Sequence, residues 1–220
     1  RIKSNTMRRL MLCFCIVAFT FSCNESDNLN NQIDAPDANF YALTIGNSWV
    51  YKNYRYNPFS ETYEDTGVID SISIVDIQDF SGKSYYKFRR LTTGNEENIT
   101  LCNSNGEHFE FLREFEGNLI NKEGSIKFTN SNYEERLFQE NQWGNIYEIL
   151  KEGNTIISVE AGEFDCINSE RYAKNLDSEQ LPGLDRFYYS DGIGLIYDTS
   201  SFISDSIPYI IRRLDSYDIQ

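Results

Sequence analysis

Histidine is almost absent from this sequence of 220 residues, which contains only His108. A serine- or cysteine-based catalytic site would have to use that imidazole as its base. His108 follows an Asn-Gly pair and is in phase with Glu110, which predicts an exposed strand position instead. A zinc site needs several cysteine or histidine ligands, and the chain after residue 23 does not supply them. We therefore expect no catalytic residue, no metal and no cofactor.

Long apolar runs are missing as well. The apolar stretch at residues 10–21 is shorter than the roughly 20 residues that a membrane-spanning helix needs. It follows Arg8 and Arg9, and a short apolar run behind basic residues is typical of a secretory signal peptide. Met7 is the expected translation start. A buried core helix is the alternative interpretation of this segment.

The apolar run ends at Thr20-Phe21-Ser22-Cys23, which resembles the lipobox of bacterial lipoproteins. Ser22 fits the small position before the cut, whereas Phe21 and Thr20 depart from the usual residues. The resemblance implies cleavage after residue 22 and attachment of fatty acyl chains such as palmitate to Cys23. Several acyl chains on one cysteine would give stable anchoring. Ordinary secretory cleavage, which would leave a free N-terminal Cys23, is the alternative.

The region after the cleavage site begins with a polar segment. Residues 24–39 are rich in Asn, Asp, Ser and Gln, include Pro36 and have few apolar side chains to pack. We therefore predict three parts: a signal peptide over residues 1–22, a lipidated flexible tether over 23–39, and one β-rich domain over 40–220.

Basic residues are scarce relative to acidic ones. Removal of the leader leaves 16 basic and 34 acidic residues, a net charge of −18. Such a surface repels phosphate backbones, so we expect no nucleic-acid partner. It also repels anionic membranes. The N-terminal lipid, rather than a protein face, is therefore the expected membrane contact.

Aromatic residues and glycine turns are abundant. Fifteen Tyr and fifteen Phe are spread along the chain, which favours strands. Glycine-containing turns recur at intervals close to those of strands joined by hairpins, and Asn105-Gly106 fits a tight type I′ turn. After that turn, Phe109 and Phe111 share one face and Leu112 interrupts the pattern. We expect a hairpin here.

Period-two alternation supports the same class. Trp49 and Tyr51 share one face, and so do Ile72 and Ile74. The apolar phase then changes after Ile74, which predicts a β-bulge nearby. Residues 132–139 could form a short helix or a strand. We expect a mainly antiparallel, strongly curved single sheet or partly open barrel with few short helices. A two-layer β-sandwich is the alternative.

Four further residues are candidates for covalent modification in an exported protein. Cys102 and Cys166 could form a disulfide, and two free thiols are the alternative. Ser71 and Ser206 each follow an Asp and precede an Ile. This resembles a short O-glycosylation pattern of exported proteins in some Gram-negative bacteria, and strand positions without modification are the alternative.

Three stretches together resemble a family of uncharacterised Gram-negative lipoproteins. They are YALTIGNSWVY at residues 41–51, AGEFDC at 161–166 and YYSDGIGLIY at 188–197. The order of these stretches matches that family, whose members are similar to open half-barrels of lipid and lipoprotein carriers. The resemblance implies an open β fold and, by analogy, a binding role.

These observations indicate a cell-envelope lipoprotein, expected at the outer membrane, that acts as a non-catalytic binding or assembly module. Its expected partner is an apolar ligand or an envelope protein. The alternative is an envelope hydrolase with a glycosidase-like carboxylate pair. Asp185, Asp191 and Asp198 lie near C-terminal glycines, but turns and solvated edges account for them.

Overall fold

The computed structural model describes residues 39–220. In this part of the chain all regular structure is β-strand, and turns and loops join the strands without a helix. The strands are β1 (Ser48–Asn57), β2 (Thr62–Phe80), β3 (Lys83–Thr93), β4 (Gly106–Phe115), β5 (Asn118–Asn121), β6 (Ile126–Thr129), β7 (Arg136–Asn141), β8 (Gly144–Leu150), β9 (Thr155–Val159), β10 (Gly162–Asn175), β11 (Gln180–Ser190), β12 (Gly194–Ser200) and β13 (Ile210–Asp218).

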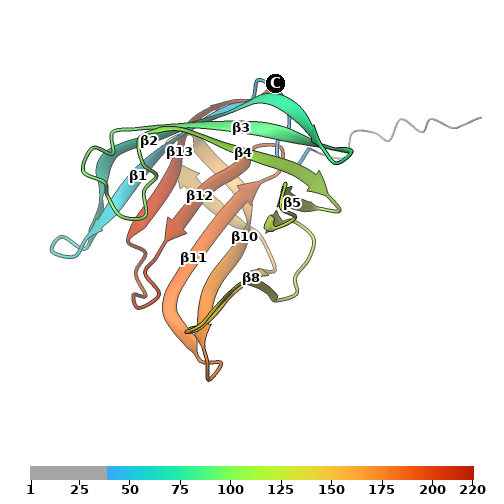
Figure 1. The fold of residues 1–220 in the computed structure, drawn as a ribbon. Helices are drawn as coiled ribbons and strands as arrows, with labels where there is room; N and C mark the ends of the chain where they lie inside the picture. The colour runs from blue at the N-terminus through green and yellow to red at the C-terminus, as the bar shows by residue number, and fades with distance from the viewer. Residues whose placement is uncertain (1–38) are drawn as a thin grey trace, which may run out of the picture. The chain divides into compact units, whose positions relative to one another are not determined.

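All thirteen strands belong to one antiparallel sheet in the order β6-β5-β4-β3-β2-β1-β13-β12-β11-β10-β8-β7, with β9 paired to β10. Pairing of β1 with β13 places the first and last strands side by side in the middle of the sheet. Figure 1 shows the sheet curling so that β3 and β4 lie across the interior from β10, β11 and β12. The predicted curved sheet or partly open barrel is confirmed. The sandwich alternative is wrong, because one sheet includes every strand.

The barrel stays unsealed between its edge strands, β6 and β7. A side chain spans this seam: Arg136 of β7 donates from Nη1 to the carbonyl oxygen of Ile126 on β6, at 3.1 Å. Arg136 also pairs with Glu148, a residue only 1% exposed, which Arg171 contacts from the other side. Glu148 is opposite both arginines in the strand register. A row of charged side chains therefore crosses the paired strands β7, β8 and β10, and the side chain of Arg136 links this row to β6 across the seam.

Aromatic side chains fill one part of the interior. The Tyr189 ring stacks on Phe128 with ring centroids 4.0 Å apart, and Tyr41 meets both rings edge-on. The Tyr41 hydroxyl donates to the Gly117 carbonyl oxygen at 2.7 Å, so its polar end is satisfied inside the core. Phe128 is fully buried. This cluster packs the β4–β6 strands against β11.

The alternation predicted for β1 and β2 is confirmed. Trp49, Tyr51 and Ile74 are buried, whereas Val75 and Ile77 are 41% and 42% exposed. The register of β2 with β3 shifts between Ile74 and Asp76, where the sequence predicts a bulge. The extra residue, Val75, leaves Ile77 opposite Tyr86 and Ile74 opposite Phe88, so both isoleucines stay on one face although the apolar phase changes in the sequence.

The structure decides one open alternative and contradicts one prediction. Residues 132–139 form no helix, and the second half of that segment belongs to strand β7, which agrees with the strand alternative. Asn105-Gly106 does not form a two-residue hairpin, because the loop between β3 and β4 covers residues 94–105. The side chain of Asn105 instead accepts a hydrogen bond from the Asn95 backbone at 2.8 Å, across that loop. Such side-chain contacts within a long loop leave no periodic signal in a sequence.

The faces of β4 are also reversed relative to the prediction. Leu112 is 5% exposed, while Phe109 and Phe115 are 48% and 49% exposed. The phase that contains His108, Glu110 and Leu112 therefore faces the interior. Leu112 belongs to the inward pattern and does not interrupt it. Partly polar interiors and outer aromatic residues make the apolar phase an unreliable guide to the inner face in this strand.

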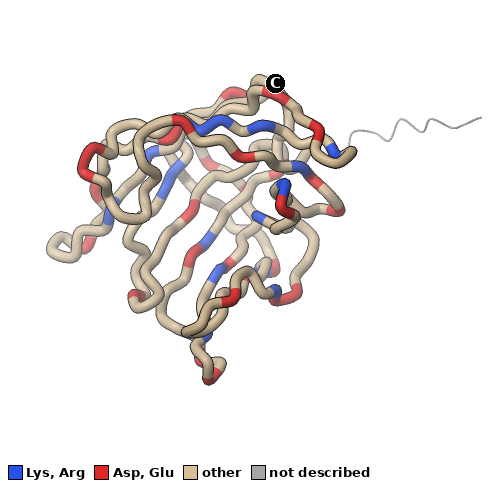
Figure 2. Tube along the Cα trace, in the orientation of Figure 1, with Lys and Arg blue, Asp and Glu red and all other residues tan. Residues whose placement is uncertain are grey.

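Acidic residues occur on strands and loops around the barrel and do not gather in one place (Figure 2). The chain as a whole has a formal net charge of −14. In residues 39–220 there is no helix with the length and apolarity needed to cross a membrane.

Candidate binding cavity

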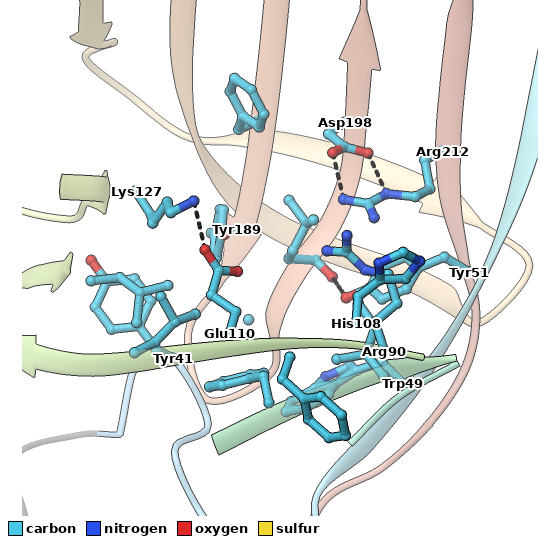
Figure 3. Close-up of a pocket in the computed structure, with 18 of the residues that line it drawn as sticks. Tyr41, Trp49, Tyr51, Arg90, His108, Glu110, Lys127, Tyr189, Asp198 and Arg212 are labelled. Atoms are coloured by element: carbon cyan, nitrogen blue, oxygen red, sulfur yellow. Dashed lines mark hydrogen bonds and ion pairs between the residues drawn. The ribbon is translucent and has the colours of Figure 1, made fainter. Parts of the chain in front are cut away.

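The interior of the barrel contains a cavity of about 470 Å³ (Figure 3). This volume lies within the range of roughly 300–1,000 Å³ that is common for small-molecule sites. Side chains from strands that are distant in sequence line it: Tyr41, Trp49, Tyr51, Ile72, Phe88, Arg90, His108, Phe109, Glu110, Leu112, Leu119, Lys127, Arg171, Phe187, Tyr189, Leu195, Asp198 and Arg212, together with Gly194.

Aromatic rings form much of the apolar wall. Trp49 stacks on Phe88 with centroids 6.2 Å apart. The indole nitrogen of Trp49 donates to the Ile193 carbonyl oxygen, and the Tyr51 hydroxyl donates to that of Leu195, both at 2.8 Å. Backbone acceptors thus satisfy the polar atoms of both side chains. The rings are left to provide apolar contact surface to the cavity.

Burial keeps the tyrosine hydroxyls of this wall protonated. It raises the pKa of Tyr51 well above its usual value, and the nearby Arg212 only partly opposes this effect. Burial, assisted by Asp198, raises the pKa of Tyr189 in the same way. The two phenols are therefore neutral hydrogen-bond groups at physiological pH.

A buried charge network adjoins this aromatic wall, and the guanidinium of Arg212 lies over the Tyr51 ring, 5.0 Å from its centroid. Arg212 of β13 is directly opposite Asp198 of β12 and donates to both of its carboxylate oxygens, at 2.9 and 2.7 Å. A third member, Asp70, lies 3.6 Å from Arg212 and is fully buried. Asp70 also accepts hydrogen bonds from Thr92 at 2.5 Å and from Asn53 at 3.2 Å. Burial alone would raise the pKa of Asp70, but Arg212 and these hydrogen bonds hold it below its usual value.

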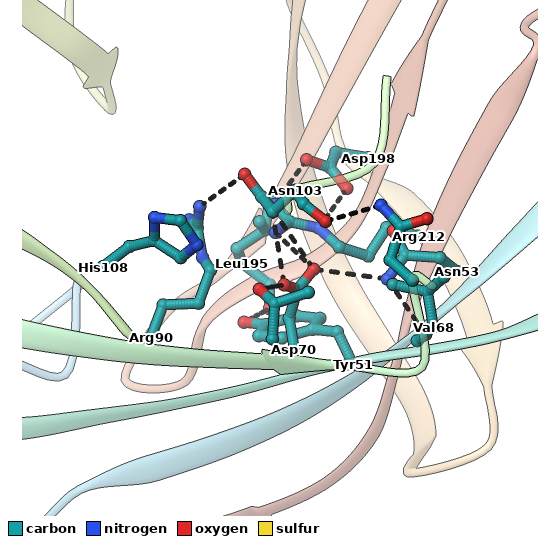
Figure 4. A network of polar contacts seen from close by, with 12 residues as sticks. Tyr51, Asn53, Val68, Asp70, Arg90, Asn103, His108, Leu195, Asp198 and Arg212 are labelled. Carbon is teal, nitrogen blue, oxygen red and sulfur yellow. Dashed lines mark hydrogen bonds and ion pairs between the residues drawn. The ribbon is translucent and has the colours of Figure 1, made fainter. Parts of the chain in front are cut away.

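Arg90 is the member of this wall with the fewest partners. Its Nη1 donates to Asn103 at 3.2 Å, and its Nε is buried without a hydrogen-bond partner. Within residues 39–220 no carboxylate forms an ion pair with it. Its Cα partner across β3 and β4 is His108, whose Nε2 donates to the Ser104 carbonyl oxygen at 2.8 Å. Figure 4 shows the imidazole beside the guanidinium. Burial, followed by repulsion from Arg212, lowers the pKa of Arg90.

The cavity borders an incompletely paired strand. Residues 106–111 of β4 pair with β3 alone, because pairing with β5 begins at Leu112. Glu110 on this edge forms an ion pair with Lys127 of β6 at 2.5 Å. Figure 3 shows this pair and the Asp198–Arg212 pair in separate parts of the cavity.

The charge balance of the lining is opposite to that of the whole chain. Four cationic side chains line the cavity, and two carboxylates accompany them. The cations are Arg90, Lys127, Arg171 and Arg212, and the carboxylates are Glu110 and Asp198. A cavity of this composition within an acidic protein favours an anionic or neutral occupant over a cationic one.

The structure places the predicted modification residues apart from the cavity. Cys23 lies outside the described residues. Cys102 lies in the β3–β4 loop and Cys166 on β10, and both are free cysteines in the structure. Burial raises the pKa of Cys102 to about 11 and that of Cys166 to about 12, so neither thiol is reactive at neutral pH.

The two serines of the glycosylation pattern differ in surroundings. Ser71 is half-buried in β2, between Val50 of β1 and Leu91 of β3. Ser206 lies exposed in the β12–β13 loop, not in a strand. A glycosyl group therefore has more room at Ser206.

The charged side chains of the cavity were not predicted from the sequence. His108 lines the cavity and is half-buried, which corrects the exposed position predicted for it. Asp198 is 8% exposed beside Arg212 and is not a solvated edge residue. Arg90 and Arg212 form no motif in the sequence, because each meets its neighbour, His108 or Asp198, across two strands and not along the chain. Within residues 39–220 no group of three metal-ligating side chains occurs.

Comparisons with known proteins support the fold. No protein-family model and no curated protein matches the chain. One similar structure is a candidate exported protein with a YmcC-like fold from Bacteroides fragilis, with 9% identity, a TM-score of 0.51 and coverage of 81% of this chain and 98% of that one. Another is a candidate lipoprotein from Parabacteroides distasonis, with 15% identity, a TM-score of 0.42 and the same coverage. The first likeness confirms the expected resemblance at the level of the fold.

Proposed function

We propose that this chain is a cell-envelope lipoprotein whose barrel is a non-catalytic binding module for an apolar small molecule. The observation that carries the proposal is the cavity of about 470 Å³ with its aromatic wall. Concave, mostly apolar cavities with a few polar groups are typical of small-molecule sites. Trp49, Tyr51 and Phe88 supply the apolar surface, and the adjoining charge network supplies the polar groups.

The envelope location draws on the N-terminal segment and on the fold. The signal-like run before Cys23 and the lipobox resemblance favour export and lipidation. The fold neighbour from Bacteroides fragilis is itself described as an exported protein. We place the chain at the outer membrane, held by its lipid rather than by its acidic surface.

The carboxylates of the cavity favour binding over glycoside hydrolysis. A glycosidase needs one carboxyl that donates a proton and a second that acts as nucleophile or base. Glu110 is held by Lys127, and Asp198 is held by two contacts from Arg212. The carboxyl with a raised pKa, Asp185, is not part of the cavity lining. No free acid–base pair faces the cavity among these residues.

Tryptophan fluorescence can test the proposal. The sequence has two tryptophans, of which Trp49 lines the cavity and Trp143 is 42% exposed on the β7–β8 turn. A Trp143→Phe variant therefore reports from the cavity alone. We expect brominated dodecanoate or dodecanol to quench Trp49 saturably. Absence of saturable quenching by either probe would contradict binding.

Two substitutions on β2 form a matched pair for this assay. Ile72→Phe adds volume inside the cavity, whereas Val75→Phe adds the same ring type at a residue that is 41% exposed and does not line the cavity. We expect Ile72→Phe to weaken quenching at every probe concentration and Val75→Phe to leave it unchanged.

Mass spectrometry of molecules that copurify with the protein tests the binding proposal independently of fluorescence. Turnover of a glycan by the pure protein would favour the hydrolase instead.

A further inference from the structure

We infer that Arg90 is an anion anchor, so that the ligand of the cavity is an amphiphile with a carboxylate or phosphate head and an apolar body. The inference rests on the proposed binding function and adds the chemical class of the ligand. It depends on the unused hydrogen-bonding capacity of Arg90 and on the position of that side chain between the polar and apolar walls.

The other cations of the cavity already have carboxylate partners. Lys127 pairs with Glu110, Arg171 with Glu148, and Arg212 with Asp198 and Asp70. Their charges are compensated within the protein. An incoming anion would have to displace a carboxylate to bind any of them.

Arg90 differs from these three residues. A guanidinium has five N–H donors in a planar fork, and Arg90 uses one contact to a neutral amide, that of Asn103. Its Nε has no partner although it is buried. A buried charge without a counter-ion is costly, and an oxyanion can accept two parallel hydrogen bonds from such a fork. A bound carboxylate or phosphate would therefore supply what the protein itself lacks at this point.

The neighbours of Arg90 define where the apolar body would lie. Phe88 precedes it by two residues on β3, so both side chains face the cavity on the same side of the strand. Phe88 stacks on Trp49, and Ile72 is the Cα partner of Arg90 on β2. A head group held by Arg90 would place an attached chain directly against this apolar wall. His108, opposite Arg90 on β4, would lie beside the head group.

The strand itself offers a matched control. Arg89 is adjacent to Arg90 but lies on the exposed surface, where it pairs with Glu107. Arg90→Gln and Arg89→Gln therefore remove the same charge from opposite faces of β3. Arg90→Lys retains the charge but loses the planar fork. Circular dichroism of each variant would verify that the β-structure is retained.

The experiment measures quenching of Trp49 in the Trp143→Phe background by three brominated probes: dodecanoate, dodecyl phosphate and dodecanol. We expect the anionic probes to bind more tightly than the alcohol. Arg90→Gln should weaken anion binding about ten- to hundredfold, the value of a charge-assisted hydrogen bond, and leave dodecanol binding unchanged. Arg90→Lys should retain part of the preference, and Arg89→Gln all of it.

The outcomes separate this inference from the proposed function. If dodecanol binds as tightly as both anions, or if Arg90→Gln weakens all three probes equally, the anchor is wrong while the binding function stands. If no probe quenches Trp49 saturably, both are wrong. The more tightly bound of the two anionic probes identifies the head group as carboxylate or phosphate.

Discussion

Asp198 and Arg212 lie directly opposite each other on β12 and β13, and their side chains form two hydrogen bonds inside the barrel, at 2.9 and 2.7 Å. Asp70 joins the same guanidinium from β2, at 3.6 Å. Through Asp70, this network links β2, near the start of the described chain, with β12 and β13 near its end. It makes Arg212 the common partner of two buried carboxylates.

Removal of Arg212 should therefore destabilise the fold strongly. Arg212→Gln leaves Asp70 and Asp198 buried without their counter-ion, which we expect to lower the free energy of unfolding by about 3–5 kcal/mol. Arg213→Gln is the control, because Arg213 is a partly exposed neighbour on the same strand that pairs with Glu160. Its loss should cost about 1 kcal/mol or less. Urea denaturation measures both, and equal effects would contradict the assigned role of Arg212.

Asp185 should make stability depend on pH. Burial raises its pKa from 3.8 to about 6, although Ser201 opposes the shift by donating a hydrogen bond to it. Because the folded-state pKa lies above the unfolded value, the stabilising contribution is complete below about pH 4 and is lost as the pH rises through 6.

Asp185→Asn removes this titration, since the amide stays neutral at every pH. We expect the variant to match the wild type near pH 4 and to exceed its free energy of unfolding by about 3 kcal/mol above pH 7. Thermal unfolding across this range measures the difference. Asp191→Asn, on an exposed turn residue, is the control. A gain for Asp185→Asn that does not change with pH would refute the explanation.

Gly94 should tolerate no side chain. It has a φ of +82°, and a Cβ placed on it would lie 2.1 Å from the backbone oxygen of Gly67. Gly82 has a similar φ of +75°, but a Cβ there meets nothing within 4 Å. Both alanine variants carry the same backbone strain, and only Gly94→Ala adds a clash with β2. We expect Gly94→Ala to be less stable than Gly82→Ala by about 1–3 kcal/mol in urea denaturation.

Cys23 should determine membrane attachment. Cys23→Ala removes the thiol that would accept the lipid, so we expect loss of fatty-acid labelling and release from the membrane fraction. Cys15→Ala, within the apolar run, should retain both properties. Labelling with a radioactive fatty acid and fractionation of cells measure the outcome. Persistent labelling of Cys23→Ala would show that the lipid is attached elsewhere.

The amino-acid sequence by itself determined the fold class and several strand faces. Period-two alternation around Trp49 and Tyr51, and the phase change after Ile74, reflect local backbone geometry, so a single segment contains the signal. Turn-forming glycines and aromatic content indicated antiparallel strands for the same reason. Residues 132–139 stayed ambiguous because a short segment can satisfy either period.

Only the tertiary structure decided which face of each strand is inside and which residues meet there. Alternation separates the phase of His108 and Leu112 from that of Phe109, but it does not say which phase faces the interior when that interior is partly polar. Arg90 and His108 become neighbours through the register of β3 with β4, across a loop of irregular contacts. Asp198 and Arg212 meet through another ladder. Such cross-strand pairs depend on sheet register and curvature, which are set by the packing of the whole barrel rather than by any local pattern.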